Sequence, residues 1–272
     1  MSILKYIAFH AITFTLAASA DTIAQLKQLT VNDQKSYRYI TITDLTPGQL
    51  RYSQLNVNEK IAAARKKNSR YNNNTSILST PLPVILAPFG PVLVDGHHDT
   101  LASIALGATT IPVFVLQDFS TLTVEEFWQQ ATKEGLVYPY TLDNKYQLPT
   151  TFDALQDDPN RFFAALIARK CVKDPNTGAM IAVASPKTKL GDYPVWIKFG
   201  NKIPFIEFKI SDTLKAHGLV YNNAWGENVS VEFVEAARAI LLKYPITGLK
   251  VIPVRTKVID NSPAAHAVCK DE

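Results

Sequence analysis

The chain has 272 residues, of which 47% are hydrophobic and 19% charged, a composition that excludes an intrinsically disordered chain. This length provides enough material for one large folded domain or two small ones. The 28 basic and 24 acidic residues give a net charge of +4, an excess too small to indicate nucleic acid binding by charge alone.

The first twenty residues have the pattern of an export signal. Lys5 provides a positively charged start, residues 6–16 are mainly apolar, and Ala18-Ser19-Ala20 fits a small-residue cleavage site. The apolar run is too short to serve as a bilayer-spanning anchor. We therefore expect residues 1–20 to be a signal peptide cleaved near Ala20. The mature chain is then secreted or periplasmic, with no stable membrane insertion; an uncleaved anchor or a buried N-terminal helix is the alternative.

Short strands and helices are predicted to follow as a mixed α/β domain over residues 21–118. The strands are indicated by alternating or continuous apolar runs, and the helices by polar capping residues ahead of helical patterns. The predicted elements are a strand over 36–45, a turn over 44–49, a helix capped by Asn56 or Asn58 that ends near Arg65, a hairpin of 82–87 and 92–94, a helix over 100–106 and a strand over 111–116.

Residues 119–272 are predicted to be mainly helical, so the fold class is α+β. The helical patterns cover residues 124–134, 159–169, 204–216 and 231–243, and residues 138–158 resemble a loop or linker. Thr123 and Ser230 are the expected helix caps. Cys171 and Cys269 either pair in an oxidising compartment or remain two unpaired thiols.

The densest group of chemically active side chains is Asp95-Gly96-His97-His98-Asp99, between a predicted strand and a predicted helix. His97 and His98 are candidate general acid/base groups, because histidine titrates near neutral pH. Asp95 is a candidate to orient a histidine or to bind Mg²⁺ or another divalent metal. Gly96 permits a tight turn and a close approach of a ligand to the backbone. The alternative is that a histidine has a purely structural role in the turn or core.

A helix that begins at this group would offer a site for a phosphate. The first backbone N–H groups of a helix lack partners within the helix and carry its positive dipole end. Thr100 is a candidate phosphate donor or, equally, a helix cap. Glu59 is a candidate second catalytic acid if the first predicted helix faces the motif, and Gln49 in the preceding turn is a candidate ligand contact. Their alternatives are an exposed helix residue and a turn residue.

Four segments together resemble a known superfamily: DLTPGQ at 44–49, Val57 with Lys60, LPVI at 82–85 and VDGHH at 94–98. The chain resembles the ParB/sulfiredoxin superfamily, in particular its ParB-like nuclease branch with a DGHH motif. The resemblance covers residues 36–118. It implies a small ParB/sulfiredoxin-like N-terminal domain whose turn and helix start hold nucleotide phosphates. It adds Lys60 and Asp99 to Gly96, Thr100 and Gln49 as candidate phosphate or nucleotide contacts.

The chain also departs from other branches of this superfamily. Sulfiredoxins have a cysteine at the motif and ParB proteins have arginines; this chain has neither. Free serine kinases have an arginine after a DGHH-like motif, where this chain has Asp99. In those kinases an early acidic position lies close to where this chain has Gln49, and Glu59 is the first acid after Gln49.

Three functions remain open at this stage. The first is a nuclease or phosphodiesterase that acts on phosphate esters at the motif, with a phosphate-containing small molecule or a nucleic acid as its partner. The second is a phosphotransferase similar to free serine kinases, which needs a nucleotide. The third is a non-catalytic nucleotide- or partner-binding protein. Export favours hydrolysis over a kinase, since water is present everywhere and nucleotides are scarce outside the cytoplasm.

Overall fold

A computed structural model describes residues 20–67, 78, 80–173, 180–184, 196–198, 205–225, 229–247 and 249–251. The predicted signal peptide, apart from Ala20, and the side chains of both cysteines lie outside these described residues. A search of the described residues finds no helix long and apolar enough to cross a membrane.

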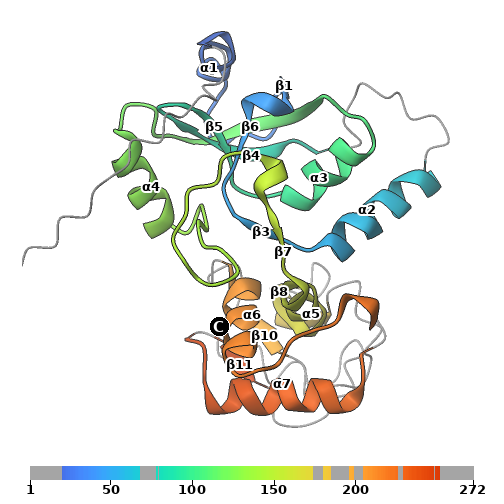
Figure 1. Cartoon of the computed structure of the whole chain (residues 1–272). Helices are drawn as coiled ribbons and strands as arrows, with labels where there is room; N and C mark the ends of the chain where they lie inside the picture. The colour runs from blue at the N-terminus through green and yellow to red at the C-terminus, as the bar shows by residue number, and fades with distance from the viewer. Residues whose placement is uncertain are drawn as a thin grey trace, which may run out of the picture.

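The first part of the chain forms a mixed α/β domain around a five-stranded sheet (Figure 1). Its sheet order is β1-β6-β4-β5-β2. The elements in chain order are α1 (Ala20–Leu26), β1 (Arg38–Thr41), the 3-10 helix η1 (Ile42–Asp44), β2 (Thr46–Pro47), β3 (Arg51–Tyr52), α2 (Gln54–Lys67), β4 (Leu82–Ala87), β5 (Gly90–Leu93), α3 (His97–Ala105), β6 (Thr110–Asp118), α4 (Val124–Lys133), η2 (Phe152–Ala154) and β7 (Gln156–Asp157).

The centre of the sheet is the hairpin of β4 and β5, which confirms the predicted hairpin. The two strands are antiparallel and meet at the pair Ala87 and Gly90, so that Pro88 and Phe89 form the turn. β6 runs parallel to β4 on the other side, and β1 pairs with β6 antiparallel as an edge strand. β2 is only two residues long and pairs parallel to β5 at the opposite edge. The end of β5 therefore lies beside the turn that follows β2.

Two apolar clusters cover the two faces of this sheet. Val84 and Leu86 of β4 belong to one cluster, while Ile85 and Ala87 of the same strand belong to the other. This is the alternation expected of a strand whose two faces are both buried. Phe127 and Trp128 of α4 pack in the second cluster, with a ring centroid separation of 5.2 Å. Helix α4 therefore belongs to the first domain, although the sequence placed it after the boundary at 118.

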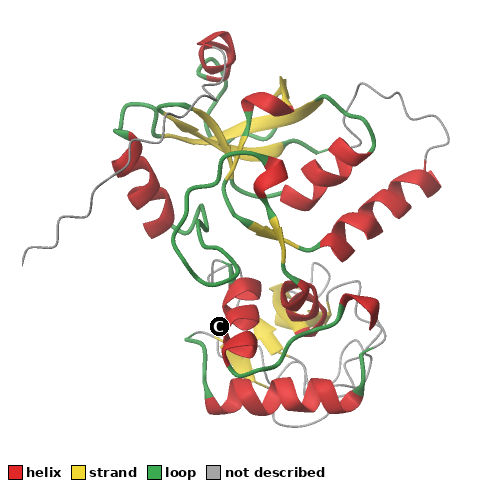
Figure 2. Ribbon diagram, viewed as in Figure 1, coloured by secondary structure: helices red, strands yellow, loops and turns green. Residues whose placement is uncertain are grey.

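A separate apolar cluster holds the second part of the chain together. It joins α5 (Pro159–Ile167), α6 (Ile206–Ala216) and α7 (Val231–Lys243) through side chains such as Phe163, Ile210 and Val234. The ribbons of these helices lie together in the lower half of Figure 2. Buried core residues before about position 158 thus pack in the clusters around the five-stranded sheet, and those after it pack in this separate cluster. This position directly follows β7, which pairs with β3. Two-residue strands such as these carry no periodic signal, which explains why the residue patterns did not locate the junction.

The second part also contains strands that the sequence patterns did not predict. These are β8 (Ala168–Lys173), β9 (Met180–Ala184), β10 (Trp196–Lys198) and β11 (Leu249–Val251), in the sheet order β11-β10-β8-β9. The helix expected over 159–169 ends at Ile167, and β8 begins at once. The α+β fold class and the later helices agree with the prediction. Residues 119–272 contain more strands than expected, because they were predicted to be mainly helical.

The helix starts show which capping signals operate. Helix α4 has the predicted cap at Thr123, completed by Glu126 as a capping box, and Ser230 accepts the Phe233 N–H at the start of α7. Helix α2 instead begins at Gln54, where the Ser53 hydroxyl accepts the Asn56 N–H at 3.2 Å. The prediction that Asn56 or Asn58 caps this helix was therefore wrong. Serine is as good a helix cap as asparagine, so residue type alone did not distinguish Ser53 from Asn56 and Asn58.

Candidate functional site

The Asp95–Asp99 group lies at the turn between β5 and α3. Gly96 is the residue before the helix and has a φ of 89°, a left-handed conformation that favours glycine. Its N–H donates to the Asp95 carboxylate at 2.7 Å. The helix begins at His97, three residues earlier than the predicted Thr100, so the two histidines and Asp99 form its first turn. Their backbone N–H groups lie at the positive end of the helix dipole.

We expect Gly96→Ala to destabilise the protein by roughly 1–3 kcal/mol, because alanine is strained at positive φ and its Cβ would overlap Leu82. A Cβ at this position would lie 2.6 Å from Leu82 Cδ2. Urea unfolding measures the change. Gly218→Ala is the matched control, because Gly218 has a φ of +78° with no heavy atom within 4 Å. Equal destabilisation of the two variants would show that the contact with Leu82 is unimportant.

His97 is a buried structural link between α3 and the turn after β2. Only 2% of the residue is exposed, and its Nε2 accepts the Gly48 N–H at 3.0 Å. Burial, with the nearby Arg161 charge, lowers the pKa of His97 to about 3. A histidine held neutral in this way stays unprotonated at neutral pH and suits a positioning role better than that of a general acid.

The buried state of His97 predicts a loss of stability in acid. The unfolded chain binds a proton below the ordinary pKa of 6.5, whereas the folded chain does not until about pH 3. The free energy of unfolding should therefore decrease as the pH is lowered from 6.5 to about 3, by up to about 1.4 kcal/mol for each pH unit. Urea unfolding at several pH values measures this slope. His97→Gln should flatten it; an unchanged slope would contradict the assigned pKa.

His98 connects α3 to two other parts of the chain. Its Nε2 lies 3.0 Å from the Ser53 N–H, which donates to it, and 3.2 Å from Arg161 Nη1. The residue is 9% exposed. Since Ser53 also caps α2, His98 fixes the starts of α2 and α3 against each other. The acceptor role at Nε2 implies the neutral ring with its proton on Nδ1.

Arg161 is a cation that the second part of the chain presents to the motif. It lies in the first turn of α5, and its Nη1 contacts both His98 and, at 3.4 Å, Asn56 Oδ1. Burial lowers the pKa of Arg161, and the charges of Glu207, Asp95 and Asp158 oppose that effect. Among the described residues no carboxylate forms an ion pair with Arg161, and its buried Nε has no hydrogen-bond partner. The guanidinium therefore adds a positive charge beside the start of α3 that is in no ion pair among the described residues.

The other predicted contacts lie around this turn in two groups. On the α2 side, Lys60 pairs with Asp99 at 2.6 Å, and Glu59 accepts a hydrogen bond from Asn56 at 3.3 Å. On the side of the core, Thr100 is buried and donates to the Gly96 carbonyl at 3.1 Å, and Gln49 is buried and donates to the Arg51 carbonyl at 2.7 Å. The structure thus joins Lys60 and Thr100 directly to the turn, whereas Glu59 and Gln49 contact Asn56 and Arg51. It also gives Asp99, Thr100 and Gln49 partners within the protein.

The acidic groups near the motif do not converge as metal ligands. Asp95 accepts from Gly96, and Asp99 pairs with Lys60. Within the described ranges, no three His, Cys, Asp or Glu side chains are grouped in a way that could hold a metal ion. The described residues therefore do not fit a divalent ion, and no chemical step is assigned to one.

A cavity of about 380 Å³ lies at the other end of α3. It is lined mainly by threonines and apolar side chains, including Ile104 and Phe152, and its one acidic residue, Asp153, is exposed. It does not include the Asp95–Asp99 group. We place the candidate site at the start of α3, because titratable groups, helix N–H groups and the Arg161 cation meet there.

The sequence patterns did not single out Arg161. Residues 159–169 show an amphipathic helix, in which an arginine is normally a solvent-facing residue. Only the fold reveals that α5 directs this residue toward α3, since 63 positions separate Arg161 from His98.

Comparisons with known proteins agree with this architecture. The crystal structure of protein Atu1540 from Agrobacterium tumefaciens is similar in fold, with a TM-score of 0.50, 22% sequence identity, and coverage of 76% of this chain and 89% of that chain. No curated protein matches the chain. A family model described as "Putative ParB-like nuclease" matches residues 38–180, from β1 to the start of β9. This match spans more than half of the 272-residue chain, and the chain therefore belongs to the ParB-like nuclease family.

Proposed function

We propose that the chain is a nuclease-like hydrolase of phosphate esters, whose phosphoryl group binds between the start of α3 and Arg161. Membership of the ParB-like nuclease family supports a nuclease-like function at the family level. The observation that carries the proposal for this site is the Arg161 guanidinium, which lies 3.2 Å from His98 and is in no ion pair within the described part of the chain. A cation next to a helix start suits an oxyanion.

The residues of the site have separate roles in this proposal. The first-turn N–H groups of α3 and the Arg161 fork hold the phosphoryl oxygens and stabilise the negative charge that builds up on them. Asp95 is the exposed carboxylate beside them; it accepts the proton of the attacking water as the new P–O bond forms, and the leaving alkoxide oxygen takes a proton from solvent as its P–O bond breaks. His98 orients Arg161. His97 and Glu59 support this arrangement through Gly48 and Asn56.

A second candidate is a non-catalytic protein that binds a phosphate-containing ligand. The observation that favours it is that Nε2 of both His97 and His98 accepts a backbone N–H, so both histidine lone pairs are engaged within the protein. The Lys60–Asp99 ion pair neutralises both charges at the position where a nucleotide-dependent phosphotransferase needs a cation. The described contacts therefore add nothing in favour of the kinase-like alternative.

One experiment separates hydrolysis from binding. Residues 21–272 are incubated with inorganic phosphate, nucleotides, free serine with ATP, and single- and double-stranded nucleic acid, with and without Mg²⁺ or Mn²⁺. We expect phosphate binding and cleavage of a phosphodiester, with cleavage lost in Asp95→Asn and binding kept. Binding without cleavage in the wild type would favour the second candidate. Absence of both binding and cleavage would contradict the phosphate site.

We also propose that the chain is exported and cleaved near Ala20. The support is the pattern of residues 1–20 given above. Expression of the full chain in a bacterium, followed by mass spectrometry of the periplasmic and secreted fractions, should give a mature N-terminus at Asp21. Replacing Ala18 and Ala20 by bulky residues should block cleavage. Retention of Met1 on the exported wild-type protein would contradict the proposal.

A further inference from the structure

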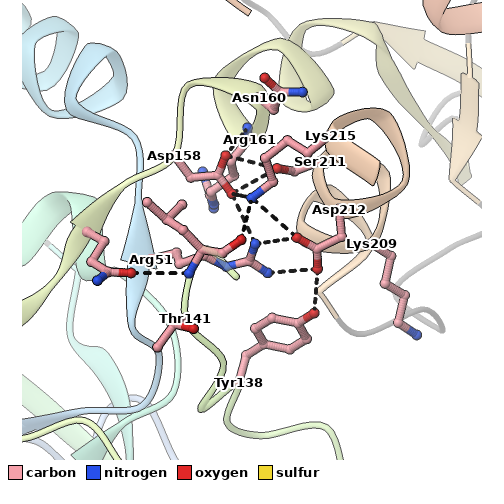
Figure 3. A network of polar contacts seen from close by, with 12 residues as sticks. Arg51, Tyr138, Thr141, Asp158, Asn160, Arg161, Lys209, Ser211, Asp212 and Lys215 are labelled. Atoms are coloured by element: carbon pink, nitrogen blue, oxygen red, sulfur yellow. Dashed lines mark hydrogen bonds and ion pairs between the residues drawn. The ribbon is translucent and has the colours of Figure 1, made fainter. Parts of the chain in front are cut away.

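A buried polar cluster joins the two parts of the chain next to Arg161 (Figure 3). We call it the Asp158 cluster; it consists of Arg51, Tyr138, Asp158, Ser211, Asp212 and Lys215. Arg51 comes from β3 in the first domain, and the side chains of Arg51, Asp158 and Ser211 are fully buried. Burying a charge is costly unless the charge is paired and hydrogen-bonded.

Asp158 occupies the centre of the cluster. The Ser211 hydroxyl donates to both of its carboxylate oxygens at 2.8 Å, and Arg51 Nη1 lies 3.3 Å and Lys215 Nζ 3.6 Å from it. Asp212 in turn accepts from both terminal guanidinium nitrogens of Arg51, Nη1 and Nη2, and from the Tyr138 hydroxyl at 3.1 Å. Two cations thus balance two carboxylates, so the cluster needs no charge from Arg161.

Asp158 is also the residue directly before α5. Its backbone N–H donates to the Tyr52 carbonyl at 2.8 Å, which attaches it to β3. Its carbonyl and its carboxylate both accept the Arg161 N–H, at 3.0 and 3.4 Å. This is the pattern of a helix cap. The position of the Arg161 backbone is therefore set by a residue that is itself anchored to the first domain.

The Phe208 ring on α6 supports the Arg161 side chain. The guanidinium carbon of Arg161 lies 5.1 Å from the ring centroid, and that of Arg51 lies 4.7 Å from it. Such distances fit cation–π contacts. Asp212 follows Phe208 by one helical turn, so the Arg51–Asp212 pair holds α6 and its ring in place. Arg161 is thus constrained at its backbone by Asp158 and at its side chain by Phe208.

We infer that Asp158 is a positioning residue that holds the Arg161 guanidinium at the start of α3, with Arg51 and Ser211 keeping Asp158 in place. The second part of the chain then completes the phosphate site of the first domain. The binding of phosphate at this site rests on the proposed function, whereas the placement of Arg161 against His98 does not.

The test compares Asp158→Ala with Asp158→Asn, since asparagine keeps the helix cap and an oxygen for Ser211. The first readout is the ¹⁵N resonance of the His98 ring, which senses Arg161 whether or not the protein is active. Arg161→Ala defines the shift caused by losing this contact. The second readout is the affinity for inorganic phosphate, measured by calorimetry. The exposed Asp143→Asn serves as a matched control for loss of a carboxylate.

We expect Asp158→Ala to move the His98 resonance in the direction of Arg161→Ala, Asp158→Asn to move it less, and Asp143→Asn not to move it. Phosphate affinity should fall on the order of tenfold in Asp158→Ala, with no further fall when Arg161→Ala is already present. If Asp158→Ala does not fold, Ser211→Ala, which removes only the hydroxyl, takes its place with a smaller expected shift in the same direction.

Two results would overturn the inference. One is a folded Asp158→Ala variant, or in its place Ser211→Ala, whose His98 resonance equals that of the wild type. The other is a loss of phosphate affinity that adds in full to the loss in Arg161→Ala, because a residue that acts through Arg161 has no effect once Arg161 is gone. If wild-type protein binds no phosphate, the proposed function fails, and the His98 resonance still decides the role of Asp158.

Discussion

Arg161→Ala is expected to reduce phosphodiester hydrolysis roughly 10²–10³-fold, the typical effect of removing one preorganised donor from a developing oxyanion. The reason is the position of the guanidinium, 3.2 Å from His98 at the start of α3 and outside any ion pair in the described structure. The loss should appear in kcat/KM, and phosphate binding by calorimetry should weaken in parallel.

Arg161→Lys is the matched variant for this prediction. It keeps the positive charge but lacks the planar fork and the contact with the Phe208 ring, so it should recover only part of the activity. The thermal unfolding of both variants must be measured, because part of the Arg161 side chain packs on that ring. Normal activity in a folded Arg161→Ala variant would contradict the assigned role.

The second large effect concerns stability. We expect Arg51→Ala to lower the free energy of unfolding by about 3–5 kcal/mol, the usual result of breaking a buried ion pair from one side. Arg51 is fully buried, and the variant would leave Asp158 and Asp212 with Lys215 as their remaining cation in the Asp158 cluster. Burial lowers the pKa of Arg51, but hydrogen bonding and charge from Asp212 and Asp158 outweigh it and raise the pKa.

Urea unfolding measures this difference, with Arg38→Ala on the exposed edge strand β1 as a control expected to change little. A double variant, Arg51→Met with Asp212→Leu, should be less destabilised than Arg51→Ala, because it removes one carboxylate together with its partner. If Arg51→Ala and Arg38→Ala unfold at the same urea concentration, the Asp158 cluster does not stabilise the protein.

Local sequence signals predicted the elements that depend on local chemistry. The Pro88–Phe89 turn between two β-rich runs forms the predicted hairpin, and Thr123 and Ser230 cap the predicted helices. Gly96 marks the predicted turn between strand and helix, where the candidate site lies. In each case the determining residues lie within a few positions of one another, so the pattern is visible in the sequence.

The remainder depends on contacts between distant residues. Arg51 and Asp212 are 161 positions apart, and the strands that join the two parts, β3 and β7, are each two residues long. Neither feature has a periodic signal. The role of His97 was also hidden, because acid/base chemistry and a buried hydrogen bond to Gly48 require the same residue type. The motif therefore predicts the candidate site, whereas the position of Arg161 beside it follows only from the fold.

The most direct test of the phosphate site is a crystal structure of residues 21–272 with a non-hydrolysable phosphodiester analogue. The proposed function predicts the phosphoryl group at the start of α3, within hydrogen-bond distance of first-turn N–H groups and of the Arg161 guanidinium. A ligand bound at the threonine-lined cavity by Ile104, or elsewhere with Arg161 uncontacted, would contradict it.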